Sequence, residues 1–120
     1  MTKLSEDDLE LIQACVEIEP ENDFELDDDP WQHLSELVEE DPVRGLAVMA
    51  EIAVRSPQLA TLSGLGEGPL EELLEANPGM VDAVIEEVRR SPGFRIALGF
   101  AWTGGLGRAD QLKLSQLLKN

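Results

Sequence analysis

The chain is poor in aromatic residues, cysteine and histidine. Aromatic residues make up 4% of its 120 residues, tyrosine is absent, and Cys15 and His33 are the single members of their types. One cysteine excludes an internal disulfide, and one cysteine with one histidine falls short of the four ligands that structural zinc usually takes. Because hydrophobic residues still reach 42%, the core must be built from Leu, Val, Ile and Ala, which is typical of helix packed on helix.

Long apolar runs are also missing. No stretch approaches the ~20 residues that cross a bilayer, and the chain passes from Ser5 directly into acidic residues instead of a signal-peptide apolar region. These features predict a cytoplasmic protein that does not contact membranes. A sequence pI near 4.1 also disfavours direct binding of DNA or RNA, because phosphates repel an acidic surface.

Basic residues are scarce in the first third of the chain. Sixteen of the 25 acidic residues lie between Glu6 and Asp41, and Lys3 is the one basic residue among the first 41. The other 79 residues carry nine acidic and eight basic side chains. A globular core does not need this asymmetry, which indicates an interaction surface or an acidic arm. The sequence therefore predicts a partner protein with a basic surface.

Prolines divide the chain into short helices. Five of the seven follow Asp, Ser or Asn, whose side-chain oxygen can accept an unpaired amide hydrogen at a helix start, where proline loses no bond. The pairs are Asp29-Pro30, Asp41-Pro42, Ser56-Pro57, Asn77-Pro78 and Ser91-Pro92. We expect each pair to start a helix, and Gly68-Pro69 to start one more.

The apolar spacing predicts an all-α single domain over residues 1–120, with no convincing strand. A first helix should run from Ser5 to Ile18, with Ser5 and Asp8 as a capping pair, and an acidic loop should follow up to about residue 29. Short antiparallel helices of this kind form either a compact bundle or helical hairpins of the HEAT type. The expected hairpins pair Pro30–Glu40 with Pro42–Val54 and Pro78–Arg90 with Pro92–Ala101. The expected core includes Leu73, Val84, Ile85, Leu98 and Trp102.

Glycine clusters predict flexible turns at two places. Gly64, Gly66 and Gly68 form one cluster, and Gly99, Gly104, Gly105 and Gly107 form the other, ahead of the last helix. Neither follows a strand or contains Gly-Lys-Ser/Thr, so a phosphate-binding loop is disfavoured.

Candidate chemical sites fail on their spacing. Asp23, Glu25 and Asp27 alternate as the early ligands of a calcium-binding EF-hand would, but Asp28 stands where that loop needs Gly, and Leu34 where it needs Glu. Near Val16 and Ile18, Cys15 is interpreted as a buried, inert thiol, and His33 as a surface or capping side chain. Arg89 and Arg90 have Glu86 and Glu87 within one turn, which favours internal ion pairs over phosphate binding. The sequence thus predicts no catalytic residue, metal, cofactor or small-molecule substrate, and no enzyme.

The predicted partner-binding surface combines acidic side chains with a few apolar anchors. Its members are Asp23, Phe24, Glu25, Leu26, Asp27, Asp28, Asp29, Trp31, Glu36, Glu39 and Glu40. The carboxylates would raise the association rate, and Phe24, Leu26 or Trp31 would add affinity. For Trp31, as for Trp102, packing in the core is the favoured role, and an interface role for Trp31 stays open.

One stretch carries a resemblance to known proteins. The segment Gly-Pro-Leu-Glu-x-Leu-Leu at residues 68–74, followed by Arg-x-x-x-Phe-Arg at residues 90–95, resembles a family of small bacterial helical proteins of unassigned function. The resemblance covers about residues 31–102 and implies a helical fold without catalytic residues. In size, acidity and helical make-up, the chain is also similar to immunity proteins that neutralise antibacterial toxins, many of them basic nucleases.

The preferred hypothesis is therefore a non-enzymatic immunity protein or inhibitor that neutralises a basic toxin or nuclease. One alternative is a helical-repeat scaffold or adaptor whose acidic residues serve solubility. Another is a DNA-mimic inhibitor of a bacterial defence nuclease, which would use the same electrostatics on a different target.

Overall fold

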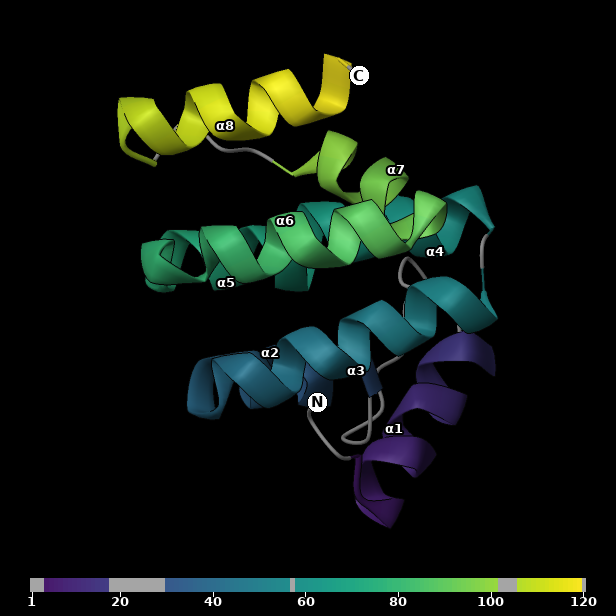
Figure 1. The fold of residues 1–120 in the computed structure, drawn as a ribbon. Coiled ribbons are helices and arrows are strands. Elements are labelled where there is room, and N and C mark those ends of the chain that lie inside the picture. Colours follow the sequence, from purple (N-terminus) through teal and green to yellow (C-terminus); the bar gives the residue numbers. More distant parts are fainter. Residues whose placement is uncertain (1–3, 18–29, 57, 102–105, 120) are drawn as a thin grey trace.

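Helices account for all the regular structure that the chain shows in its described residues, 4–17, 30–56, 58–101 and 106–119 (Figure 1). In this computed structural model the α-helices are α1 (Glu6–Glu17), α2 (Pro30–Glu40), α3 (Pro42–Arg55), α4 (Leu59–Leu65), α5 (Glu71–Ala76), α6 (Val81–Arg90), α7 (Pro92–Phe100) and α8 (Arg108–Lys119). A π-helical segment, η1 (Gly66–Leu70), joins α4 to α5, and a 3₁₀ turn, η2 (Pro78–Met80), precedes α6. The predicted all-α class is confirmed, and none of the described helices is long and apolar enough to cross a bilayer.

Local capping starts several helices where the sequence predicts. The Asp41 carboxylate accepts the Arg44 amide hydrogen at 3.2 Å, and the Ser91 hydroxyl accepts that of Phe94 at 3.2 Å. In α1, the Asp8 amide donates to Ser5 Oγ and the Ser5 amide donates to Asp8 Oδ2, so the expected capping pair is confirmed. Each interaction spans three residues, which is why the sequence alone reveals it.

Two of the other predicted caps are wrong in detail. Ser56 ends α3, and its hydroxyl lies 3.0 Å from the Thr61 hydroxyl; α4 begins only at Leu59 without a side-chain cap. Helical structure does begin at Pro78, but as a 3₁₀ turn in which Asn77 makes no side-chain cap. Helix α2 begins at Pro30 as expected, while Asp29 lies outside the described residues.

The Gly68-Pro69 pair does not start a helix. Instead, α4, η1 and α5 follow one another without a break from Leu59 to Ala76. Before a proline, a Cβ disfavours helical backbone, and Gly68 has none. The wider π-helical turn accommodates Pro69, which cannot donate a backbone hydrogen bond.

The glycine cluster in this segment serves close packing rather than a flexible turn. A Cβ built on Gly66 would lie 2.0 Å from the carbonyl oxygen of Ala97 and 2.9 Å from Cβ of Phe100, both on α7. The absent side chain lets the η1 backbone approach α7 directly. Gly99, assigned from sequence to the second flexible stretch, lies within α7.

The expected helical hairpins are present. Helix α2 packs on α3, and α6 packs on α7, with a single residue between the helices of each pair, Asp41 and Ser91. Helix α5 contacts α2, whereas α4 and η1 contact α7, so the continuous α4–η1–α5 segment connects the hairpins. Helix α1 lies against the α2–α3 side and α8 lies beyond α6 (Figure 1).

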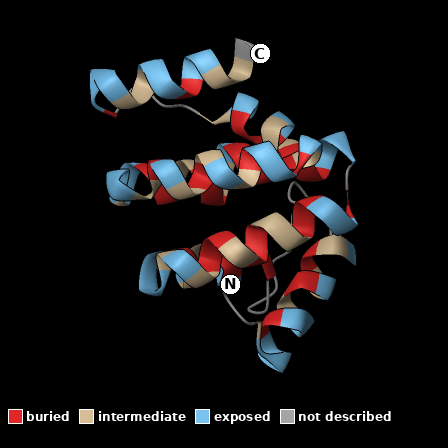
Figure 2. Ribbon diagram, in the orientation of Figure 1, coloured by how far each residue is buried: buried red, intermediate tan, exposed pale blue. Residues whose placement is uncertain are grey.

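One core, aliphatic apart from Trp31 and Phe94 among its buried carbon side chains, runs through this arrangement (Figure 2). Leu73, Val84 and Leu98 are fully buried as predicted. Ile85 is only half-buried because it faces a groove between α6 and α8, and Trp102 lies outside the described residues. Trp31 has 7% of its surface exposed, which confirms its favoured role in the core.

A half-buried ion pair attaches α1 to α3: the Asp8 side chain is buried, and Arg44 is 38% exposed. Asp8 is 3% exposed, and its two carboxylate oxygens accept the Arg44 Nε hydrogen at 2.8 and 3.0 Å. The same guanidinium donates to Ser5 Oγ at 2.9 Å. The hydrogen bond from Arg44 is the main reason that the pKa of Asp8 lies below its ordinary value of 3.8; burial acts against it, and the Ser5 hydrogen bonds lower the pKa further.

We expect Leu73→Ala to lower the free energy of unfolding by about 2 to 5 kcal/mol, because the vacated core volume cannot fully collapse. Leu112→Ala, on the exposed side of α8, is the matched control and should change it by less than about 0.5 kcal/mol. Denaturant titration measures both. A loss below about 1 kcal/mol for Leu73→Ala would contradict its place in the core.

We expect Gly66→Ala to destabilise the fold by about 1 to 3 kcal/mol, since the new methyl group would overlap the Ala97 carbonyl. Gly99→Ala is the control on the facing helix, where a Cβ would meet nothing within 4 Å. That variant should be neutral or stabilising by up to about 1 kcal/mol, as alanine is the better helix former. Equal stability of the two variants would contradict the close approach of the η1 backbone to α7 at Gly66.

The contribution of Asp8 should depend on pH. Because its folded-state pKa is lowered, its stabilisation is fully present above 3.8 and is lost as the pH falls through the lower folded value. The difference in thermal midpoint between wild type and Asp8→Asn should thus be constant from neutral pH to about 4 and shrink below. Asp7 and Asp41 also favour charged Arg44, but through charge alone and without a bond to its guanidinium. Asp7→Asn is therefore the control, because it removes a nearby charge and leaves the Asp8–Arg44 hydrogen bond in place. A constant difference down to pH 2 would refute the assignment.

Candidate partner-binding site

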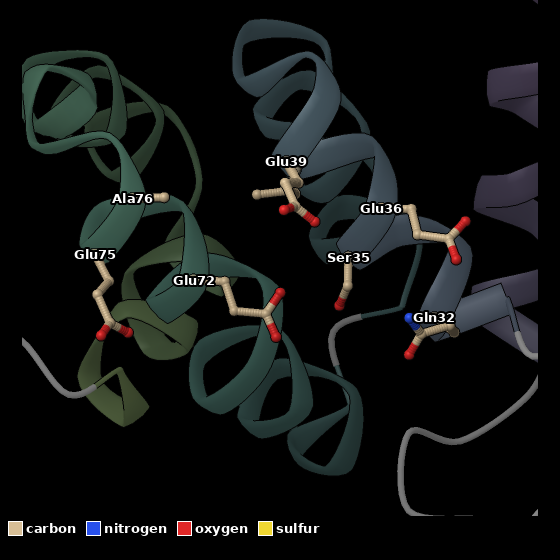
Figure 3. A pocket seen from close by; sticks show the side chains of 8 residues that line it. Gln32, Ser35, Glu36, Glu39, Glu72, Glu75 and Ala76 are labelled. Atoms are coloured by element: carbon tan, nitrogen blue, oxygen red, sulfur yellow. The ribbon is translucent and has the colours of Figure 1, made fainter.

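A groove of about 540 Å³ lies between α2 and α5 (Figure 3). Helix α2 buries Leu34 and Val38 in the core, and Val38 also lines the groove beside polar residues of the same helix. Helix α5 buries Leu73 and Leu74 and lines the groove with its exposed side. The lining residues are Gln32, Ser35, Glu36, Val38 and Glu39 from α2, and Glu72, Glu75 and Ala76 from α5.

The groove is acidic on both sides. Glu36 and Glu39 belong to α2, Glu72 and Glu75 belong to α5, and none of the described residues that line the groove is basic. In Figure 3, the Glu72 carboxylate is directed into the space between the helices, while Glu36 and Glu75 lie at its two margins. Their spacing of three residues on each helix places each pair on one face.

Little within the described chain neutralises these carboxylates. Glu36 Oε2 lies 3.7 Å from Nδ1 of His33, and both side chains are about half exposed, so this contact is weak. Glu39, Glu72 and Glu75 form no ion pair with a described residue. Acidic side chains on both sides of the groove give it a negative potential that favours a cationic partner.

A second groove, of about 490 Å³, is lined by both acidic and basic side chains. It lies between α6 and α8 and is lined by Asp82, Ile85, Glu86, Arg89, Lys113, Gln116 and Leu117. Its two basic side chains balance two acidic ones in exposed ion pairs, since Lys113 lies 3.6 Å from Asp82, and Arg89 lies 3.2 Å from Glu86. The ion pairs expected for Arg89 and Arg90 are thereby confirmed, the latter to Glu87 at 3.7 Å.

The residue types of the α2–α5 groove do not point to chemistry. In the part of the chain that the structure describes, no group of three or more His, Cys, Asp or Glu side chains has the arrangement to hold a metal ion. Cys15 is fully buried away from the groove, as predicted, and His33 is exposed on α2. The groove offers carboxylates, a hydroxyl and an amide, which are hydrogen-bond acceptors suited to a cationic partner.

The structure describes four of the predicted partner-binding residues. Glu36 and Glu39 line the groove, Glu40 is exposed at the end of α2 outside it, and Trp31 is in the core. The seven others lie outside the described residues: Asp23, Phe24, Glu25, Leu26, Asp27, Asp28 and Asp29. They stay predictions.

Sequence reasoning missed Glu72 and Glu75. Both belong to the part of the chain that is nearly neutral overall, so its net charge gives no sign of a local acidic surface. The signal that could find them is local: in Glu71-Glu72-Leu73-Leu74-Glu75, the leucines define a buried face, and Glu72 and Glu75 lie on an exposed one. That this face meets α2 is decided by packing.

Comparisons with protein-family models, with curated proteins and with solved structures find no match to this chain. The family resemblance of residues 31–102 and the likeness to immunity proteins therefore stay predictions.

Proposed function

We propose that the protein is a non-enzymatic binding protein, and specifically an immunity protein or inhibitor that neutralises a basic toxin or nuclease. The observation that carries the proposal is the α2–α5 groove, which four glutamates from two helices line, with no basic side chain among its described lining residues. The groove provides a concave acidic binding surface in addition to the strongly acidic first third of the chain. The proposed location is the cytoplasm.

Electrostatics would govern the encounter. A protein with a formal net charge of −16 attracts a basic partner over a distance comparable to the Debye length, about 8 Å at physiological salt and about 30 Å at 10 mM. Complementary charge raises the association rate and rejects acidic competitors. The groove would then receive Lys or Arg side chains, whose positive charge relieves the repulsion among the four carboxylates.

A scaffold is the second candidate, and the helical hairpins α2–α3 and α6–α7 favour it, because stacked hairpins form extended binding faces. In that case the glutamates would serve solubility, and a partner's affinity would depend little on them. A DNA-mimic inhibitor of a defence nuclease is a third candidate and shares the electrostatics of the first.

The test neutralises the groove without changing its shape. We expect Glu36→Gln, Glu39→Gln, Glu72→Gln and Glu75→Gln, combined in one variant, to leave the thermal midpoint nearly unchanged or slightly raised, because exposed like charges stabilise little. The association rate with a basic protein captured by the wild type from a bacterial lysate should fall at least about tenfold near 10 mM salt. The difference should nearly vanish near 150 mM salt.

The matched control changes net charge by the same amount outside the groove. Glu6, Glu10, Glu17 and Glu67 are exposed and can be replaced together by Gln. This control should keep the association rate within about threefold of wild type. A third variant, with Glu25, Asp27, Asp28 and Asp29 replaced by their amides, tests the acidic segment predicted from sequence. Equal slowing by the groove variant and the control would mean that net charge alone acts. Equal rates for all four proteins would favour the scaffold.

A further inference from the structure

Helices α4 and α7 differ in charge from the other α-helices that the structure describes. Helix α4 contains no charged residue, and α7 contains one, Arg95. The Arg95 guanidinium donates to the carbonyl oxygen of Leu118 at 2.9 Å, so this side chain is bonded to α8. Each of the other six described α-helices carries at least three charged residues. In a chain of which 28% is charged, α4 and α7 therefore form a region almost without charge.

The two helices pack side by side, so their outer residues form one surface (Figure 1). They approach closely at two glycines. A Cβ built on Gly93 of α7 would lie 3.6 Å from Leu62 Cδ2 of α4, and one built on Gly66 would lie 2.0 Å from the Ala97 carbonyl oxygen. Both contacts advance in the same direction along the chain, so the α4–η1 segment runs parallel to α7. The exposed residues of one helix thus lie beside those of the other.

The exposed residues of this surface are apolar or small. Leu59 is 65% exposed, Ile96 47% and Phe100 39%. Ala60 and Gly99 are also exposed, and a Cβ at Gly99 would meet nothing within 4 Å. Apolar surface gathered in one place marks an interaction site, and the centres of protein interfaces are depleted in charge. We call this surface the α4–α7 face and define it as Leu59, Ala60, Ser63, Ile96, Gly99 and Phe100.

The charge of the chain restricts where a second copy can approach. Two copies, each with a formal net charge of −16, repel one another. At physiological salt the Debye length of about 8 Å is short beside the smallest dimension of the molecule, 24 Å, so the charges close to the contact decide. The α4–α7 face has no charged member, and Glu67, one turn beyond Ser63, borders it. The exposed apolar residues of α3 and α8, by contrast, share their helices with several charged side chains.

The α4–α7 face is also suited to contact a copy of itself. In a two-fold dimer the same residues lie on both sides, so each protrusion needs a depression on the same face. Ile96 and Phe100 provide protrusions, and Gly99, three residues from Ile96 and next to Phe100, provides the depression. The face is smaller than the roughly 20 to 30 residues per side of a standard interface, which indicates a weak, reversible dimer.

We propose that the α4–α7 face is a homodimer interface, across which two copies of the chain associate about a two-fold axis. A basic partner gains little from a face without carboxylates, whereas a second copy avoids its own repulsion there. None of the residues of the face lines the α2–α5 groove, so the dimer leaves both grooves open. The inference is independent of what the groove binds.

Sedimentation velocity of the full chain, from about 5 μM to about 1 mM, measures the association. We expect a monomer–dimer equilibrium that tightens at least about fivefold between about 10 mM and about 500 mM salt, because salt screens the repulsion between the copies. Binding of a basic protein at the groove weakens over the same range, so the sign of the salt dependence separates the two proposals. A chain that stays monomeric at about 1 mM in about 500 mM salt would overturn the dimer.

Charge placed on the face tests where the copies meet. We expect Ile96→Glu and Phe100→Glu each to weaken the dimer at least about tenfold, because the new carboxylate would lie against a copy of itself. Leu112→Glu is the matched control: it adds the same charge at a side chain that is 53% exposed on α8, and it should stay within about twofold of wild type. Equal weakening in all three variants would mean that net charge alone acts, and wild-type affinity in both face variants would place the interface elsewhere.

Shape is tested without a change of charge by Gly99→Gln. The fold accommodates this side chain, since a Cβ at Gly99 meets nothing within 4 Å, and an unchanged thermal midpoint checks it. The dimer should weaken at least about fivefold, because the depression is filled on both copies. Wild-type association of this variant would refute the proposed contact at Gly99. Should Ile96→Glu or Phe100→Glu fail to fold, Gly99→Gln and the salt dependence of the wild type still decide.

Discussion

The arrangement of the two hairpins depends on the contact between the η1 backbone and α7 at Gly66. The carbonyl oxygen of Ala97 occupies the space in which any other residue would carry its Cβ. The helical segment from Leu59 to Ala76 can therefore lie directly on α7 at one end and reach α2 at the other. Without this close approach, α5 would not lie beside α2, and the acidic groove between them would not exist.

The groove shows how an aliphatic core leaves acidic residues available for binding. Burial of leucines on α2 and α5 stabilises both helices, so their outer faces are free to carry charges that contribute nothing to stability. In the α6–α8 groove, lysine and arginine pair with neighbouring acids. Around α2 and α5, no described arginine or lysine plays that part. The two grooves are of similar size. They differ in the charges of the side chains that line them: acidic between α2 and α5, and both acidic and basic between α6 and α8.

The ion pairs of the molecule differ in how much they contribute to stability. The pairs of Arg55, Arg89 and Arg90 link positions one turn apart on the same helix and are exposed, so each adds little to stability. The pair of Asp8 with Arg44 joins two helices, and its carboxylate is almost completely buried. Loss of Asp8 would leave Arg44 without its main side-chain bond, whereas the exposed acids of α1 make no such bond to another helix among the described residues.

The sequence by itself determined what depends on neighbours within about one turn of helix. The helical class, the starts of α3 and α7 at Asp41 and Ser91, and the Ser5–Asp8 cap all follow from side chains and amides three residues apart. Tertiary structure alone decided the unbroken course through Gly66, the meeting of Glu36 and Glu39 with Glu72 and Glu75, and the bond between Asp8 and Arg44 across 36 positions. A capping residue competes only with its own backbone, whereas contacts between distant residues depend on how all the buried faces pack together.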